Sequence, residues 1–444
     1  MKKTLTGLFA AGLLLSSSLT MAVDTDLSAA VKADYDSHLK DLFIHFHQNP
    51  ELSFQEHETA KRMAEELRAA GFEVTEGIGK TGVVAIMKNG DGPLIAMRAD
   101  MDGLPVEEKS GLSYASKATQ EDMFSDNALV PVMHACGHDV HITSLVGTAR
   151  RMAEMKDKWA GTLMLIVQPA EERVLGAKAM MDDGIWEKFG KPDMALAFHV
   201  SSGDEAGVVN VVPSSPYAGV DTVDIIVHGI GAHGASPHTG KDPVLIGSQI
   251  VVALQTLVSR ELAPREPGVV TVGSFHAGLK HNIISDKAVL QLTVRNTSLE
   301  TRKLLLDGIK RIAVNIGRAN GLPDHLLPEV NVLDESSPPT INTPELANRL
   351  KAVWIEKMGD DKVTSIMPTG MGAEDFPFFT TDPHIPSVYW AIGGTPKKDM
   401  DAAKAGTGPA IPSHHSPIFK ITPEPAVRSG VESTVHALLE LMPK

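Results

Sequence analysis

The chain has 444 residues and a net charge of −14, with 43% hydrophobic and 22% charged residues. These values are ordinary for a soluble globular protein of more than one domain. The acidic balance, together with the lack of a long basic run, argues against a nucleic-acid groove and against binding to an anionic membrane surface.

The first residues predict an export signal. Lys2 and Lys3 precede an apolar stretch over residues 5–15, and small or polar residues then lead to Ala22, a plausible cleavage point. The apolar stretch is well short of the ~20 residues that a membrane-spanning helix needs. We therefore expect residues 1–22 to be a signal peptide and the mature protein to be exported to the periplasm, with no membrane attachment after cleavage.

The next segment alternates between helical and strand patterns. Apolar spacing predicts helices over residues 39–47 and 56–70. Residues 81–87 and 94–97 predict strands, and the glycine-containing segment 88–92 between them is typical of a hairpin. The second strand leads directly into a short acidic segment that contains Asp102.

The only cysteine of the chain, Cys136, lies in the densest run of candidate metal ligands, HACGHDVH over residues 134–141. Its thiolate and the imidazole of His138 can face one point if Gly137 turns the backbone, and the helix predicted over 142–149 would give them a rigid support. The alternative is a free buried cysteine beside histidines that cap a helix. An unpaired thiol in an exported chain would be open to oxidation unless something held it, so the export signal favours metal binding.

Two later runs are apolar throughout, as strands buried on both faces are. Residues 162–167 are followed by Glu171 and Glu172, and residues 194–198 are followed by His199. Open α/β sheets build their sites beyond the carboxyl ends of such strands. For the paired glutamates, a solvated helix start is the alternative interpretation.

The texture of the sequence changes at the Pro- and Ser-rich segment 212–216. From there the order strand, helix, strand, strand, helix, strand predicts a ferredoxin-like α+β domain at residues 216–334, inserted between two parts of a catalytic domain, 23–215 and 335–444. The expected strands are 222–228, 269–275, 288–294 and 329–333, and the expected helices are 243–262 and 301–319. The second catalytic part should hold helices over 345–357 and 424–441 and a strand over 388–392.

Five side chains could form a two-metal site: Cys136, His138, Glu172, His199 and His415. Thiolate, imidazole and carboxylate together suit zinc, manganese, cobalt or nickel better than magnesium or calcium. Two such ions can activate water and polarise a carbonyl, which suits amide hydrolysis. One of the two neighbouring glutamates can bind metal while the other transfers a proton from water to the leaving nitrogen.

The remaining candidates carry weaker signals. Asp102 could orient a metal ligand, or it could be only a turn residue before Gly103. Histidines in loops are usually solvated, and this alternative applies to the tandem His414-His415 and to His233 in the inserted domain.

Several motifs together resemble the amidohydrolase family of hippurate hydrolases, N-acyl-amino-acid deacylases and auxin-conjugate hydrolases, within the aminoacylase and carboxypeptidase group. The resemblance runs from about residue 40 to the end. The motifs are NPELS at 49–53, RADMDGLP at 98–105, the Cys136 run, QPAEE at 168–172, AFH at 197–199, AHGASP at 232–237, HNII at 281–284, GAEDF at 372–376 and HSP at 415–417.

The resemblance implies that Cys136, His138, Glu172, His199 and His415 bind the metals and that Glu171 is the general base. It also implies that His233 reaches the substrate from a partner subunit, that Asn282 helps to hold the substrate carboxylate, and that the inserted domain is both lid and dimerisation element. The chain departs from the family pattern at residues 173–175 and 201–205. Both segments flank the site, so its acyl pocket can differ from those of better-known members.

We therefore expect a mixed-sheet α/β catalytic domain with helices on both faces, plus the ferredoxin-like insert. The expected activity is hydrolysis of N-acyl amino acids by metal-activated water, with two divalent ions per subunit, manganese or zinc first, in a homodimer. A carboxypeptidase or dipeptidase on the same scaffold is the runner-up. A periplasmic solute-binding protein is the rival from another class, but it has no use for a base beside a metal ligand.

Overall fold

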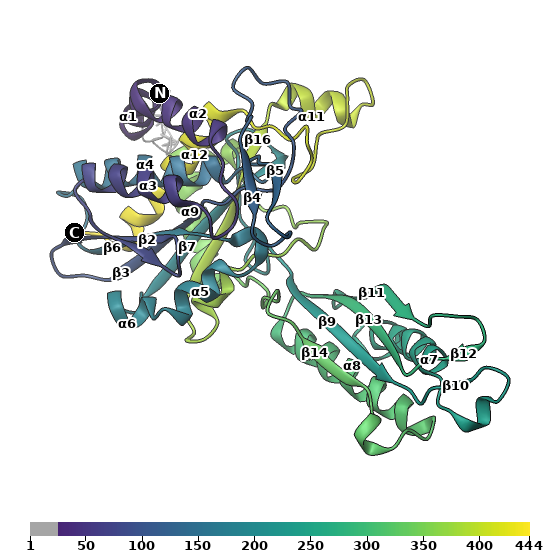
Figure 1. The fold of residues 1–444 in the computed structure, drawn as a ribbon. Coiled ribbons are helices and arrows are strands. Elements are labelled where there is room, and N and C mark those ends of the chain that lie inside the picture. The colour runs from purple at the N-terminus through teal and green to yellow at the C-terminus, as the bar shows by residue number, and fades with distance from the viewer. Residues whose placement is uncertain (1–24) are drawn as a thin grey trace, which may run out of the picture.

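The computed structural model describes residues 25–444, so the predicted signal peptide lies outside the described residues. The chain forms a larger unit around an eight-stranded sheet and a smaller unit around a four-stranded sheet (Figure 1). We call the segment 219–332 the four-stranded unit. The expected fold class, a mixed α/β protein, is confirmed.

The large sheet is parallel at its centre and has antiparallel strand pairs towards both edges. The four central strands β6, β3, β7 and β16 run parallel, whereas β1 and β2 pair antiparallel beside β6. The strand order is β1 (Glu73–Ile78), β2 (Gly82–Asn89), β6 (Gly161–Gln168), β3 (Leu94–Asp100), β7 (Met194–Glu205), β16 (Ser387–Thr395), β8 (Val209–Asn210) and β15 (Val363–Thr364).

The hairpin predicted at residues 88–92 is wrong. The strands on either side of it, β2 and β3, do not pair, because β6 lies between them, antiparallel to β2 and parallel to β3. The glycines do reverse the chain there. However, β6 is apolar along its length, so it is buried on both faces and pairs along both edges. It therefore lies between β2 and β3 and separates them. A local turn signal does not reveal such a distant partner.

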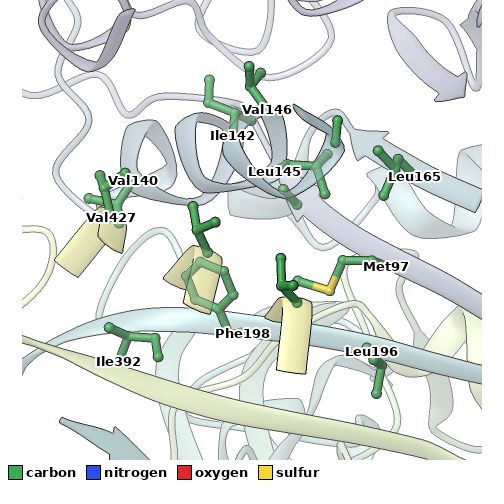
Figure 2. Packing of buried hydrophobic residues seen from close by; sticks show 14 of the residues in the cluster. Met97, Val140, Ile142, Leu145, Val146, Leu165, Leu196, Phe198, Ile392 and Val427 are labelled. Atoms are coloured by element: carbon green, nitrogen blue, oxygen red, sulfur yellow. The ribbon is translucent and has the colours of Figure 1, made fainter. Parts of the chain in front are cut away.

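Helices cover both faces of this sheet. One face packs against α2 (Lys40–Gln48), α3 (His57–Ala69), α4 (His138–Glu154), α9 (Pro344–Met358) and α12 (Pro423–Leu441). The opposite face packs against α5 (Gly176–Asp182), α6 (Ile185–Phe189) and α10 (Pro377–Thr380). Figure 2 shows α4 above the strands that carry Met97, Leu196 and Phe198. Because α4 is buried nearly all round, it holds the residues at its N-terminus rigidly.

Two predicted elements are longer than expected. The helix expected at 39–47 continues a helical segment that starts at α1 (Thr25–Asp34) and passes through a π turn, Tyr35–Leu39. The strand expected to stop at Phe198 extends through His199 to Glu205, because its parallel neighbour β16 keeps pairing with it. His199 therefore lies inside β7 and not beyond its end.

The four-stranded unit has the order β11, β13, β9, β14, with every neighbouring pair antiparallel. Along the chain it reads β9 (Gly219–His228), α7 (Pro243–Thr256), β11 (Gly268–Ala277), β13 (Lys287–Asn296), α8 (Leu299–Ala319) and β14 (Glu329–Val332). This is the β-α-β-β-α-β order expected of a ferredoxin-like fold. It has its own apolar core, with Ile225, Ile250, Leu290 and Ile309 at its centre. The exact limits 216 and 334 stay predictions.

Three further pieces complete the chain. β4 (Thr119–Asp122) and β5 (Ala128–Pro131) form a separate hairpin, and α11 (Lys397–Lys404) precedes the last loop. β10 (Ala232–His233) and β12 (Ile283–Ile284) form a ribbon at the end of the four-stranded unit that points away from the large sheet (Figure 1). Two chain segments connect the two units. These segments lie side by side, because single β-bridges pair Tyr217 with Thr340 and Val220 with Ser337.

Candidate metal centre

The predicted metal ligands converge. Cys136, His138 and His199 form a group whose ligand atoms all lie within 4.8 Å of one another, and the same holds for Cys136, Glu172 and His415. A third group, His138, Glu171 and Glu172, overlaps both. The residues that bind metal according to the resemblance, together with the predicted base, thus form one connected cluster that we call the metal cluster.

The cluster begins at a sharp turn of the backbone. Gly137 has φ +86°, and a Cβ at that position would lie only 2.4 Å from Cγ1 of Val200, so no other residue fits there without movement. The turn places Cys136 and His138, the first residue of α4, toward a common point. Gly137 therefore has the role that the sequence predicted for it.

Hydrogen bonds fix which nitrogen each histidine turns toward the cluster. His138 donates from Nδ1 to the backbone oxygen of Asp102 at 2.8 Å, and His199 donates from Nδ1 to the oxygen of Val200 at 2.7 Å. Both Nε2 atoms then face the cluster, and Nε2 of His199 lies 3.4 Å from Sγ of Cys136. This arrangement is common for metal-binding histidines.

Asp102 and Glu56 hold the turn that carries Glu171 and Glu172, which we call the glutamate turn. The carboxylate of Asp102 accepts hydrogen bonds from the backbone N–H groups of Glu171 and Glu172, both at 3.1 Å, while Glu56 accepts from Ala170 at 2.9 Å. Ala170 has φ +49°, which is unusual for a residue with a side chain. Buried carboxylates thus maintain the conformation of the turn that carries the predicted base.

The metal cluster carries an excess of buried acid. Burial raises the pKa of Glu171 well above its usual range, and nearby carboxylates, first Glu374 and then Glu172, add to the effect. Burial likewise raises the pKa of Glu172 to about 8, although His138 opposes the shift, and it raises the pKa of Cys136 well above its usual value. Nε2 of His138 and Oε1 of Glu172 are buried without a hydrogen-bond partner. Acceptor atoms of this kind fit divalent cations.

The tandem histidines differ in their surroundings. Nε2 of His415, the predicted ligand, lies 3.3 Å from Oε2 of Glu172, although 57% of its side chain is exposed and its backbone has φ +66°. His414, for which no separate role was predicted, is more deeply buried and has Nδ1 at 3.6 Å from Sγ of Cys136. Burial lowers the pKa of His414 to about 4, so it is neutral. The tandem of two histidines in the sequence could have indicated that His414 also lies beside Cys136.

A buried ionic network beneath the cluster was missed. Arg98, which is 1% exposed, contacts Asp100 at 2.6 Å, Glu374 at 2.7 Å and Asp375 at 3.2 Å. Tyr389 donates a hydrogen bond to Glu374 at 2.6 Å. The motifs that contain these residues were recognised, but only Asp102 received a role. The available signal was an arginine inside an otherwise apolar strand, which requires buried acids around it.

His141 connects this network to the cluster. It donates from Nδ1 to Asp100, and its Nε2 accepts the backbone N–H of Val200 at 2.8 Å. Its ring packs edge-on against the ring of His199, with the centroids 4.5 Å apart. His141 therefore positions His199 through both its ring and the neighbouring backbone.

His233 and Asn282 lie close together but away from the metal cluster. The N–H of Gly234 donates to the backbone oxygen of Asn282 at 2.8 Å, and His233 pairs with Ile283 in the terminal ribbon (Figure 1). Neither residue lines the cavity at the cluster. One chain alone does not bring them to Cys136, and the supply of His233 by a partner subunit stays a prediction.

A cavity of about 420 Å³ opens onto the metal cluster. Its opposite wall contains Val220 and Arg295 from β9 and β13 of the four-stranded unit. The guanidinium of Arg295 has no hydrogen-bond or ion-pair partner among residues 25–444, and burial lowers its pKa. Arg295 was not predicted, because its position depends on how the two units meet.

Comparisons with known proteins agree with one another. The model of peptidase family M20/M25/M40 matches residues 96–405. The hippurate hydrolase of Campylobacter jejuni is 39% identical over 75% of this chain and 82% of its own length, and thermostable carboxypeptidase 2 of Saccharolobus solfataricus is 34% identical over 89% and 92%. A solved dinuclear metal-binding peptidase of the M20 family from Bacillus subtilis superposes with a TM-score of 0.71, at 27% identity, over 92% of this chain and 98% of its own.

Proposed function

Because this chain belongs to peptidase family M20/M25/M40 and is a metal-dependent hydrolase, we propose that it hydrolyses the amide bond of N-acyl amino acids. The observation that carries the proposal is the convergence of Cys136, His138, Glu172 and His199 beside a buried glutamate, in a cavity that also contains the unpaired cation of Arg295. Such a cavity has the groups to hold metal, to move a proton and to bind a carboxylate.

Two divalent ions per subunit would be held by Cys136, His138, Glu172, His199 and His415. When bound, they would lower the pKa of a water molecule and polarise the scissile carbonyl. Manganese and zinc are the first candidates, with cobalt and nickel next, because the ligand set mixes thiolate, imidazole and carboxylate. Asp102 orients His138 through its backbone oxygen and the glutamate turn through its carboxylate.

Glu171 is the proposed general base. Its carboxylate is buried beside His138 and Glu172, and burial among other carboxylates raises its pKa. Two bound cations would oppose this shift and keep the carboxylate ionised before water attacks. A carboxylate with a raised pKa accepts the proton of an attacking water and returns it to the leaving nitrogen. The turn held by Asp102 and Glu56 keeps this group in place.

Arg295 is suited to the carboxylate of the amino-acid product. Its guanidinium lines the same cavity as the metal cluster and makes no hydrogen bond or ion pair within residues 25–444, although the charge of Asp221 acts on it. Guanidinium and carboxylate groups form paired, charge-assisted hydrogen bonds. In our proposal the substrate therefore lies with its carboxylate at Arg295 and its amide at the metal cluster.

A homodimer would complete the site. The helical segment Pro243–Glu261 is the one helix among the described residues that is long and apolar enough to cross a membrane by those criteria alone. One of its faces packs into the core through Ile246 and Ile250, but Val252 on its outer face is 71% exposed. A second copy of this chain would cover that outer face. We propose that the partner's four-stranded unit supplies His233 and Asn282 to this site, and that the dimer works in the periplasm.

The experiment is a hydrolysis assay on N-acetyl and N-benzoyl amino acids after chelation and addition of each metal. Glu171→Gln should retain bound metal but lose at least a hundredfold in kcat, and the exposed Glu58→Gln should keep full activity. Full turnover by Glu171→Gln would refute its role as base. A carboxypeptidase is the second candidate, because a carboxypeptidase is among the relatives. Faster cleavage of peptides than of acyl amino acids would favour it.

A further inference from the structure

A second cavity of about 420 Å³ adjoins the one at the metal cluster. The two cavities share three wall residues, Tyr217, Gly372 and His414. Arg295 lines only the first, and the second is lined by none of the predicted metal ligands and not by Glu171. A substrate whose amide lies at the metal cluster can therefore extend past His414 into this second space, which we call the side cavity.

The side cavity has an apolar rim. Val212, Ile366, Met367, Pro368 and Trp390 contribute to its walls. Ile366 and Met367 are 60% and 53% exposed, so large apolar side chains face solvent at its mouth. Exposed apolar groups gathered around a cavity are typical of a surface that binds an apolar ligand.

The loop that carries this rim is held in place. The side chain of Asn210 accepts a hydrogen bond from the backbone N–H of Ile366 at 2.8 Å and donates one to its carbonyl at 3.0 Å. The hydroxyl of Ser214 contacts the sulfur of Met367 at 3.3 Å. The apolar groups are thus fixed toward the cavity by specific bonds, and their exposure is a built feature of the loop.

The charges of the two cavities are opposite in sign. Asp204 lines the side cavity and has no hydrogen-bond or ion-pair partner among residues 25–444, and no lysine or arginine lines that cavity. Arg295 lies in the other cavity. A carboxylate is therefore attracted at one end of the combined space and repelled at the other. This asymmetry also fixes the direction in which a substrate binds.

We propose that the side cavity binds the acyl group, and that the enzyme selects N-acyl amino acids with a neutral, apolar acyl group longer than acetyl. Octanoyl and benzoyl groups fit this description, whereas the second carboxylate of a succinyl group would approach Asp204. The inference rests on the proposed function, because it assigns the two ends of the same substrate. It makes Ile366, Met367 and Asp204 specificity-determining residues.

The test compares kcat/KM for the N-acetyl, N-octanoyl and N-succinyl derivatives of one amino acid. The wild-type protein should prefer octanoyl to acetyl by at least tenfold, since extra methylene groups leave water. The double variant Ile366→Ser/Met367→Ser should lower that ratio at least tenfold. Leu129→Ser removes a matched apolar side chain, 69% exposed on the separate hairpin, and should leave the ratio unchanged. Asp204→Asn should raise the succinyl-to-octanoyl ratio several-fold.

The outcomes separate the two proposals. If none of the three derivatives is cleaved with any metal, the proposed function fails. If acetyl and octanoyl derivatives are cleaved equally well, or if the double variant and Leu129→Ser give the same ratio, the side cavity is not the acyl site although the proposed function stands. Efficient cleavage of the succinyl derivative by the wild-type protein would overturn the role of Asp204.

Discussion

Replacing Arg98 with methionine tests whether the buried ionic network supports the metal cluster. Methionine is long enough to fill much of the same space, but it removes the cation that contacts Asp100, Glu374 and Asp375. Removing one partner of a buried ion pair costs roughly 3–5 kcal/mol, because the remaining charges stay buried without compensation. Since whole domains are stable by only about 5–15 kcal/mol, the variant should lose a large part of its stability.

Two comparison variants set the scale. Tyr389→Phe removes one hydrogen bond to Glu374, which keeps Arg98 and the backbone N–H groups of Asp375 and Phe376 as partners. The expected cost is about 1.5–3 kcal/mol, as for one hydrogen bond to a charged group. Arg349→Met breaks an exposed pair with Glu440 and should cost less than about 1 kcal/mol.

Urea unfolding followed by tryptophan fluorescence measures all three variants. The expected order of destabilisation is Arg98→Met, then Tyr389→Phe, then Arg349→Met, with unchanged dependence on urea concentration. A loss in Arg98→Met no larger than that in Arg349→Met would refute the reasoning, since it would mean that the buried carboxylates are not held by this cation.

Three further predictions follow from the site and its surroundings. Burial alone lowers the pKa of His47, but hydrogen bonds with Asp139 and Glu108 raise it to about 9. Its stabilisation is therefore complete below the unfolded-state pKa of ~6.5 and is lost as the pH rises through about 9. Urea unfolding should show His47→Gln destabilised by roughly 2–3 kcal/mol at pH 6 and much less at pH 10, and an equal difference at both values would contradict this. Cys136→Ser should lose at least tenfold in metal affinity, and a metal content equal to wild type after dialysis would exclude a ligand role. Chelation should lower the midpoint of thermal unfolding by several degrees, and added zinc or manganese should restore the midpoint, because ligands that bind only the folded state stabilise that state. A midpoint that chelation leaves unchanged would count against a metal at this site.

The sequence predicted the fold class, the enzyme class and the family, and all three are confirmed. Periodicity located the helices and strands because each long element buries a regular face. Which strands pair with one another was harder to predict. The glycines at 88–92 indicated a hairpin, but β6 separates the two strands, and β7 extends past His199 because β16 continues beside it. Both errors concern partners distant in sequence, which a local pattern does not contain.

The candidate site divides in the same way. Cys136 and His138 could be found because they are neighbours in sequence and chemically distinctive. Arg98 and Arg295 could not, since their importance depends on what surrounds them after folding: acids in one case and an open cavity in the other. The ligand roles of these side chains stay predictions.

In our proposal the larger unit holds the cations, and the smaller unit holds the carboxylate of the substrate. Every proposed metal ligand belongs to the larger unit. Val220 and Arg295 lie on strands of the four-stranded unit, which two chain segments connect to the larger unit. A swing of the smaller unit would carry the carboxylate anchor away and leave the donor atoms around the ions undisturbed. If the proposed function holds, an enzyme arranged in this manner could release its amino-acid product without loosening the ligands of its ions.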